Sequence, residues 1–310
     1  MSHPLVGAEE LPSWQLRLLE RIQAVSEIHY RTVFHGRPQY SASNGAGSVQ
    51  LETWRTHLRA LEYERAELEL HATGADVPQA MIDHAVQVGS RGVRWGETPE
   101  TARLVRPGAD LLSQDMRELI ASDVWRLEQS ALVRAEHLHR VHTGALPDDE
   151  SGSRQLHDNM AALWRRATGT AALTDISPAE AEQLWGRGPK SWQRVAELTA
   201  ASYTDLELQA RFGVLAWKGV LVEVSADFDK YAGTATRIGP PTPLQMADRA
   251  EAALAAVNSA DGHRPRFERP IATAVEATSA DTGTEWEPNP DPEPHPPDPG
   301  REPGREQGVW

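Results

Sequence analysis

The sequence predicts an all-α protein of two helical modules, followed by a disordered, acidic, proline-rich C-terminal tail. Three observations lead to this prediction. Apolar residues recur every three or four positions from Pro12 to Val257, which is the period of an amphipathic helix. Proline, glycine and capping residues stand where those helices would begin and end. Proline density and acidic charge dominate the chain after residue 258.

The predicted division rests on an acidic segment, PDDESGS, which interrupts the helical pattern. Such a cluster of turn-forming residues is typical of a connection between packed elements. The predicted parts are a flexible N-terminus (1–10), an N-terminal module (11–145), a linker (146–153), a C-terminal module (154–257) and the tail (258–310).

The N-terminal module begins with a helix predicted from about Pro12 to Phe34, and a second helix predicted to end at Gly74. A loop rich in Gly and Ser separates them, so the two helices should form an antiparallel hairpin. The second helix has near-heptad apolar spacing over three heptads, too few for a long coiled coil. The apolar faces consist of Trp14, Leu18, Ile22 and Val25 in the first helix, and of Leu51, Trp54, Leu58, Leu61, Leu68 and Ala72 in the second.

Residues 66–95 read as a helix, a tight turn and a short helix, followed by two arginines. This order resembles a helix-turn-helix, and it makes DNA binding the alternative function. Gln79 and His84 are the candidates for base contacts, and Arg91 and Arg94 are the candidates for phosphate contacts. Acidic neighbours in the same segment favour an ordinary helical corner.

The longest helix is predicted from about Asp110 to His142, and its end carries Glu136, His139 and His142. Carboxylate and imidazole groups three residues apart occur in di-iron bundles, but those sites need further carboxylates that this chain does not offer at matching spacing. Cationic groups at a helix C-terminus also complement the helix dipole. The sequence therefore predicts a solvated helix end and no metal site.

The C-terminal module contains two capping boxes, Ser177 with Glu180 and Thr204 with Glu207, which fix where two helices begin. Residues 219–231 fit either a strand or a helix, and this alternative stays open. The predicted helices span about 154–168, 178–185, 190–202, 205–217 and 243–257, with Trp164, Trp185, Trp192 and Trp217 as expected core residues.

The composition excludes several function classes. The chain has no cysteine, a net charge of −14 and no run of about 20 apolar residues, so disulfides, thiolate zinc sites, a general nucleic-acid surface and a membrane span are not expected. Of that charge, 11 acidic residues and 5 arginines give −6 to the tail, which also holds 10 of the 22 prolines. GRGPKS lacks the glycine spacing of a phosphate loop.

The resulting hypothesis is a cytoplasmic, non-catalytic adaptor or scaffold that acts through protein–protein interaction and needs no cofactor. Trp310, at the end of the acidic tail, is a candidate for docking to the partner. A homo-oligomer is possible, and nucleic acid is the less favoured partner. An enzyme with a site assembled from distant residues is the third hypothesis, because such a site is invisible in one sequence.

Overall fold

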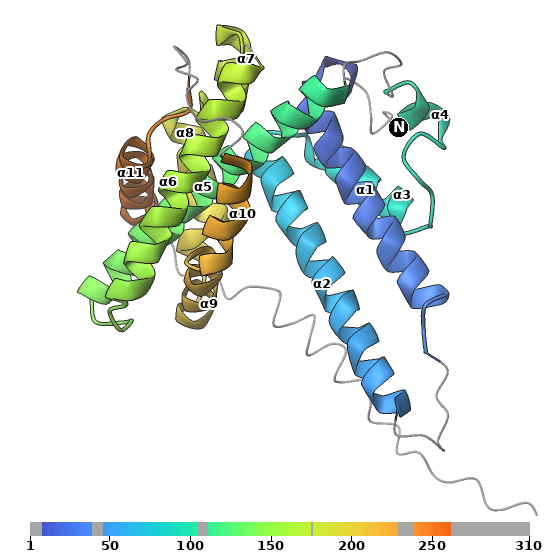
Figure 1. The fold of residues 1–310 in the computed structure, drawn as a ribbon, viewed down its shortest axis with the longest axis horizontal. Helices are drawn as coiled ribbons and strands as arrows, with labels where there is room; N and C mark the ends of the chain where they lie inside the picture. The colour runs from blue at the N-terminus through green and yellow to red at the C-terminus, as the bar shows by residue number, and fades with distance from the viewer. Residues whose placement is uncertain (1–7, 39–45, 105–110, 175, 229–238, 262–310) are drawn as a thin grey trace, which may run out of the picture. The chain divides into compact units, whose positions relative to one another are not determined.

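The computed structural model describes residues 8–38, 46–104, 111–174, 176–228 and 239–261, and it confirms the all-α fold (Figure 1). Every regular element within these ranges is helical, and no strand occurs in them. Two short 3₁₀ turns lie at Ala8–Glu10 and Ala200–Ser202. The α-helices are α1 (Ser13–Phe34), α2 (Ala46–Gly74), α3 (Gln79–Gly89), α4 (Pro99–Ala102), α5 (Leu111–His142), α6 (Glu150–Leu173), α7 (Pro178–Trp185), α8 (Pro189–Leu198), α9 (Asp205–Leu215), α10 (Lys218–Phe228) and α11 (Pro243–Asp261).

Helices α1 and α2 form the predicted antiparallel hairpin, and α3 packs along α1 (Figure 1). Leu18 and Ile22 of α1 and Leu68 of α2 are buried between them. Gly89 brings α3 unusually close to α1, because a Cβ atom at this position would lie 2.3 Å from the carbonyl oxygen of Gln23. A glycine is therefore required at this crossing.

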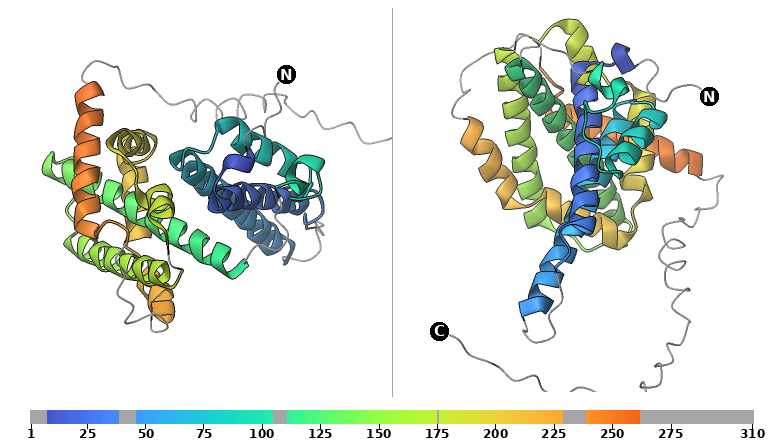
Figure 2. Two further views of the ribbon diagram at one scale, coloured as in Figure 1. Left: turned by 90° about the horizontal axis from the view of Figure 1, so that it is seen from above. Right: turned by 90° about the vertical axis from the view of Figure 1, so that its right-hand side faces the viewer.

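Helix α5 is the central element of the fold. It packs against α1 and also against α6, α9 and α11, and α11 packs on α8 as well (Figure 2). Gly144 follows its last turn with φ of 76°, the left-handed conformation that commonly ends a helix. The contacts of α5 thus cross the boundary predicted between the two modules, and the described residues belong to one compact unit.

The segment predicted as a linker is shorter in the structure, because α6 begins at Glu150. Asp149 is its N-cap, and the Asp149 side chain accepts a hydrogen bond of 2.8 Å from the amide of Gly152. This cap satisfies an orphan amide of the first turn and makes residues 150–153 helical. The sequence-based start at residue 154 was therefore four residues late.

Both predicted capping boxes are present, Ser177 with Glu180 at α7 and Thr204 with Glu207 at α9. The open alternative at 219–231 is resolved as a helix as far as Phe228, and residues 229–231 lie outside the described ranges. The last helix continues to Asp261, beyond the expected end at Val257. The rest of the predicted tail, residues 262–310, also lies outside the described ranges.

The four tryptophans expected in the core do not share one environment. Trp185 and Trp192 are buried, and Trp164 is partly buried with its indole donating a 3.1 Å hydrogen bond to the carbonyl of Pro240. Trp217 is 66% exposed, so its assignment to the core was wrong. Helix α9 ends at Leu215, so Trp217 lies beyond the helix and its side chain does not continue the buried face of α9.

Candidate interaction surface

The buried carboxylates of α5 are engaged by arginines. Asp123 forms a bidentate pair with Arg166 of α6, with distances of 2.6 and 2.8 Å. Glu128 accepts two hydrogen bonds, at 3.0 and 3.1 Å, from Arg187, which also donates to the carbonyl of Gly74. A buried charge is tolerated when it is paired in this way. These titratable groups therefore join helices, and they are not free for acid–base chemistry.

The sequence predicts no metal site at the end of α5. In the structure, the three residues considered there, Glu136, His139 and His142, have different surroundings. Glu136 accepts a 2.8 Å hydrogen bond from Arg140, and Nδ1 of His142 lies 2.7 Å from the carbonyl oxygen of Leu138. His139 is exposed. No group of three or more His, Cys, Asp or Glu side chains suited to a metal ion occurs among the described residues.

His71 of α2 is buried beside two tryptophans. Its ring stacks on Trp125 with centroids 4.9 Å apart, and its centroid lies 6.3 Å from that of Trp14. Burial lowers the pKa of His71 to about 3, with a smaller contribution from the charges of Arg187 and Arg21. The neutral ring thus serves as an aromatic core residue over the physiological pH range.

The candidate DNA-contact residues lie in α3 and in the segment after it. Gln79 lies at the start of α3 and donates a 2.8 Å hydrogen bond to Asp83 one turn later, and His84 is half-buried. Arg91 is exposed beyond the other end of α3. Arg94 has its Nε 3.7 Å from the buried carboxylate of Glu27. The acidic groups beside these residues do not favour phosphate contacts, so DNA binding stays an untested prediction.

The outer half of the α1–α2 hairpin, which we call the hairpin tip, consists of residues 28–38 and 49–60. The first turns of α2, which belong to the tip, project beyond the neighbouring helices (Figure 2, right). The tip is held together by contacts between its two helices, such as the 2.9 Å hydrogen bond from the indole of Trp54 to the carbonyl of Thr32. Phe34 and Val49 are 66% and 67% exposed, and Ile28 is exposed as well.

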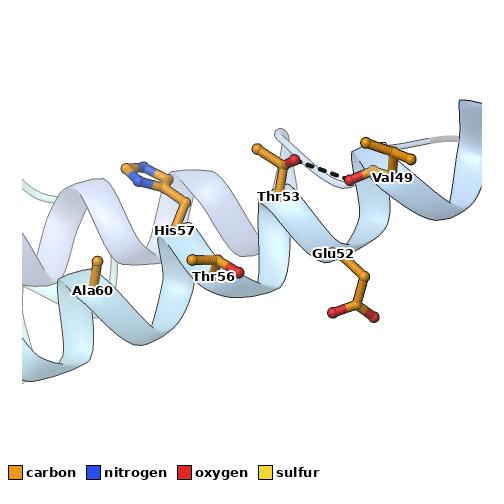
Figure 3. Close-up of a pocket in the computed structure, with 6 residues that line it drawn as sticks. All are labelled: Val49, Glu52, Thr53, Thr56, His57 and Ala60. Atoms are coloured by element: carbon orange, nitrogen blue, oxygen red, sulfur yellow. Dashed lines mark hydrogen bonds between the residues drawn. The ribbon is translucent and has the colours of Figure 1, made fainter.

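A shallow hollow lies along the tip on one face of α2 (Figure 3). All the lining residues that the structure describes come from this one helix, and the hollow is open to solvent. Short side chains dominate that lining, which consists of Val49, Glu52, Thr53, Thr56, His57 and Ala60. A face of short side chains allows another helix to approach closely.

The tip has the opposite charge to the protein as a whole. It contains four arginines (Arg31, Arg37, Arg55 and Arg59) and one glutamate, a net charge of +3, whereas the whole chain carries −14. Arg55 pairs with Glu52 at 2.7 Å, and Arg31 pairs with Glu27. The surface therefore combines exposed apolar groups with a basic field.

Sequence reasoning missed this surface, because the periodicity of α2 identifies its buried side without stating how far the helix extends beyond its neighbours. The sequence offered one signal, which is the presence of apolar residues at both ends of the loop, Phe34 and Val49. Trp310, the predicted docking residue, lies outside the described residues.

No protein-family model, curated protein or solved structure matches the chain. Among the described helices, none has the length and apolar character needed to cross a membrane.

Proposed function

We propose that this chain is a non-catalytic cytoplasmic adaptor or scaffold that binds a protein partner through the hairpin tip. The observation that carries the proposal is the exposure of Phe34 and Val49 at the outer end of the α1–α2 hairpin. Exposed apolar groups that gather on one surface are typical of sites for protein contact.

The chemistry of the tip favours an amphipathic helix with acidic flanks as the partner. A helix laid along the groove of α2 would bury Val49 and contact the short side chains of Thr53 and Thr56. Acidic residues at its edges would meet Arg55 and Arg59, which both lie on the exposed surface of the tip. Complementary charge of this kind directs association and selects the partner.

Two further features support a non-catalytic role in a reducing compartment. The buried acidic groups of α5 are paired with arginine, as described above, and thus serve the packing of helices. The absence of cysteine fits a compartment in which disulfides do not form.

The test is co-purification from native cells with quantitative mass spectrometry, comparing the natural chain with a Phe34→Glu/Val49→Glu variant. We expect at least one partner to be lost with the variant, since two charges would then lie in the apolar contact. Leu244→Glu on α11 is the control for a charge at an exposed apolar position outside the tip, since Leu244 is 73% exposed.

Thermal unfolding of all three proteins establishes that the substitutions leave the fold intact. If every co-purifying protein is recovered equally with the tip variant and with the natural chain, the hairpin tip is not the docking surface and the proposal is wrong.

A further inference from the structure

The helices of the described ranges form two groups that meet over a small area. We call α1, α2 and α3 the hairpin group, and α5 to α11 the α5 group; they are consecutive in sequence, so the chain passes between them once. Helices within each group pack on one another extensively, whereas the groups meet chiefly where α1 contacts α5 and α2 contacts α8. A small contact between two packed groups permits one to move as a rigid body against the other.

The last turn of α2 is held firmly by the α5 group. The ring of His71 stacks on Trp125, and Gly74 lies so close to that indole that a Cβ atom would be 2.6 Å from it. Arg187 donates to the carbonyl of Gly74, and Arg194 of α8 donates to the carbonyl of the preceding residue. Carbonyls at a helix C-terminus have no partner within the helix, so these arginines satisfy them and fix the turn.

The residues that follow α2 strengthen the same contact. The amide of Val77 donates to the carbonyl of Ala72 at 3.0 Å, and that of Asp76 donates to Thr73 at 3.2 Å, which are the two bonds of a Schellman motif. Asp76 occupies the position that glycine usually takes, with φ of 60°. Its carboxylate lies 3.0 Å from Arg194. The aspartate therefore adds an ion pair to α8 at a position where glycine would be less strained.

A second contact lies farther along α2, and Arg211 of α9 makes it. The guanidinium donates to the carboxylate of Glu67 at 2.6 Å and to the hydroxyl of Tyr63. Tyr63 is about 16 Å along the helix from the end of α2, so this contact resists rotation with a longer lever arm. Its base is rigid, because the neighbouring Phe212 stacks on His137 of α5 with ring centroids 4.1 Å apart.

The ion pairs between α1 and α5 are more exposed than the pair of Arg211 with Glu67. Arg17 contacts Asp115 at 2.9 Å, and Arg21 contacts Glu118 at 3.0 Å. Exposed pairs of this kind contribute little to stability. The side chains of Arg211 and Glu67 are only 11% and 29% exposed, so their attraction is screened less by solvent and salt.

Beyond Glu67 the hairpin forms a long lever. Helix α2 continues for about 27 Å to Val49, and its first turns project beyond the neighbouring helices (Figure 2, right). It is one continuous helix packed on α1, so it moves as a unit. A swing of about 15° on the last turn of α2 would displace Thr56, 18 residues before Gly74, by about 7 Å.

We propose that the hairpin group swings on the last turn of α2 as a hinge, and that Arg211 is the latch that holds it to α9. Release of the latch separates Arg211 from Glu67 and keeps the stack of His71 on Trp125. The swing carries the hairpin tip with it. The inference goes beyond the proposed function and does not depend on it, because the swing is a property of the chain without a partner.

The test measures the distance between the two groups. Because the chain has no cysteine, thiols introduced at two positions can be spin-labelled selectively. We choose Thr56→Cys on α2 and Leu206→Cys on α9, both exposed, and measure the distance by double electron–electron resonance. The natural latch should give one narrow distribution. Arg211→Glu should broaden it or shift its mean by about 5 Å or more, the scale of the swing, because two like charges then meet at Glu67.

The exchanged pair Arg211→Glu/Glu67→Arg should restore the narrow distribution, since it forms the ion pair again with the charges reversed. Glu67→Gln is a milder variant, which removes the charge and keeps the shape, and it should change the distribution in the same direction to a smaller extent. Circular dichroism establishes that each variant keeps its helices.

Two controls separate a hinge from a local disturbance. Arg154→Glu makes the same change of charge at an exposed pair with Glu150 on α6, and it should leave the distribution unchanged. Labels at Lys190→Cys and Leu206→Cys lie within the α5 group, on α8 and α9, and their distance should not respond to Arg211→Glu.

An Arg211→Glu chain that keeps the natural distribution contradicts the proposal, because the hairpin group is then fixed without the latch. So does an exchanged pair that fails to restore the distance, since the effect would then not come from the contact with Glu67. A change between Lys190→Cys and Leu206→Cys would show that α9 itself has moved, and the hinge would be wrong. None of these outcomes involves a partner, so they are distinct from failure of the hairpin-tip function.

Discussion

At the scale of single residues, the pair Asp123–Arg166 shows how polar groups specify the contact between α5 and α6. Both side chains are almost completely buried, and their two hydrogen bonds fix the relative positions of the helices. We expect Arg166→Met to lower the free energy of unfolding by about 3–5 kcal/mol, because it leaves the Asp123 carboxylate buried without its main partner. Urea unfolding at pH 7 measures this loss.

The double variant Asp123→Leu/Arg166→Met is the control for lost packing, since it removes both charges while keeping apolar volume. It should recover much of the stability lost by the single variant. A single-variant loss below about 1 kcal/mol would mean that water or Arg126 compensates the carboxylate.

His71 makes the stability of the fold depend on pH. Its folded pKa of about 3 lies below the ordinary value of 6.5, so only the unfolded chain takes up this proton between those pH values. Stability from His71 is complete above pH 6.5 and falls as the pH drops toward 3, by up to about 1.4 kcal/mol per pH unit.

Replacing His71 with Phe should reduce that dependence, since an aromatic ring stays beside Trp14 and Trp125 but no longer titrates. The measurement is the free energy of unfolding from pH 7 to pH 4 for both proteins. Parallel curves would show that water reaches the ring and that its pKa is close to the ordinary value.

At the scale of elements, helix ends were predictable where a side chain or a glycine defines them. Ser177, Thr204 and Gly74 mark boundaries that the structure confirms. The start of α6 was missed because Asp149 lies in a run of acidic residues that resembles a linker, although it caps the helix. Trp217 was assigned to the core wrongly, because the apolar periodicity does not show that α9 ends two residues before it, at Leu215.

Two glycines within helices should respond oppositely to the same substitution. Gly89→Ala should lower the free energy of unfolding by about 1–3 kcal/mol or more, because its Cβ would overlap the backbone of α1 at Gln23. Gly213→Ala should raise it by about 0.5–1 kcal/mol, because alanine favours the helix and meets no neighbour.

Both variants are measured by thermal unfolding. Equal effects of the two substitutions would show that α3 does not approach α1 as closely as the structure describes.

At the scale of the whole molecule, the sequence predicted the class of the fold but not which faces meet. Amphipathic patterns give each helix one inner side, yet α5 has neighbours from both halves of the chain, and its polar residues Asp123 and Glu128 face inward. A pattern of apolar residues does not identify such positions, because their partners Arg166 and Arg187 lie 43 and 59 residues away. The hairpin tip escaped prediction for a related reason, since exposure depends on where neighbouring helices end.

Removing residues 263–310 should leave the stability of the helical body nearly unchanged. The removed segment holds 10 prolines and few large apolar residues, a composition that cannot bury enough surface to offset the entropy of ordering. Because 1 kcal/mol shifts the melting temperature of a body of this size by about 2–4 °C, the change should stay below about 2 °C. Differential scanning calorimetry measures it, with truncation after Gly262 chosen so that α11 keeps its last turn. A fall of more than about 5 °C that Trp286→Ala or Trp310→Ala reproduces would instead make these tryptophans part of the core, and Trp310 would then be unavailable for a partner.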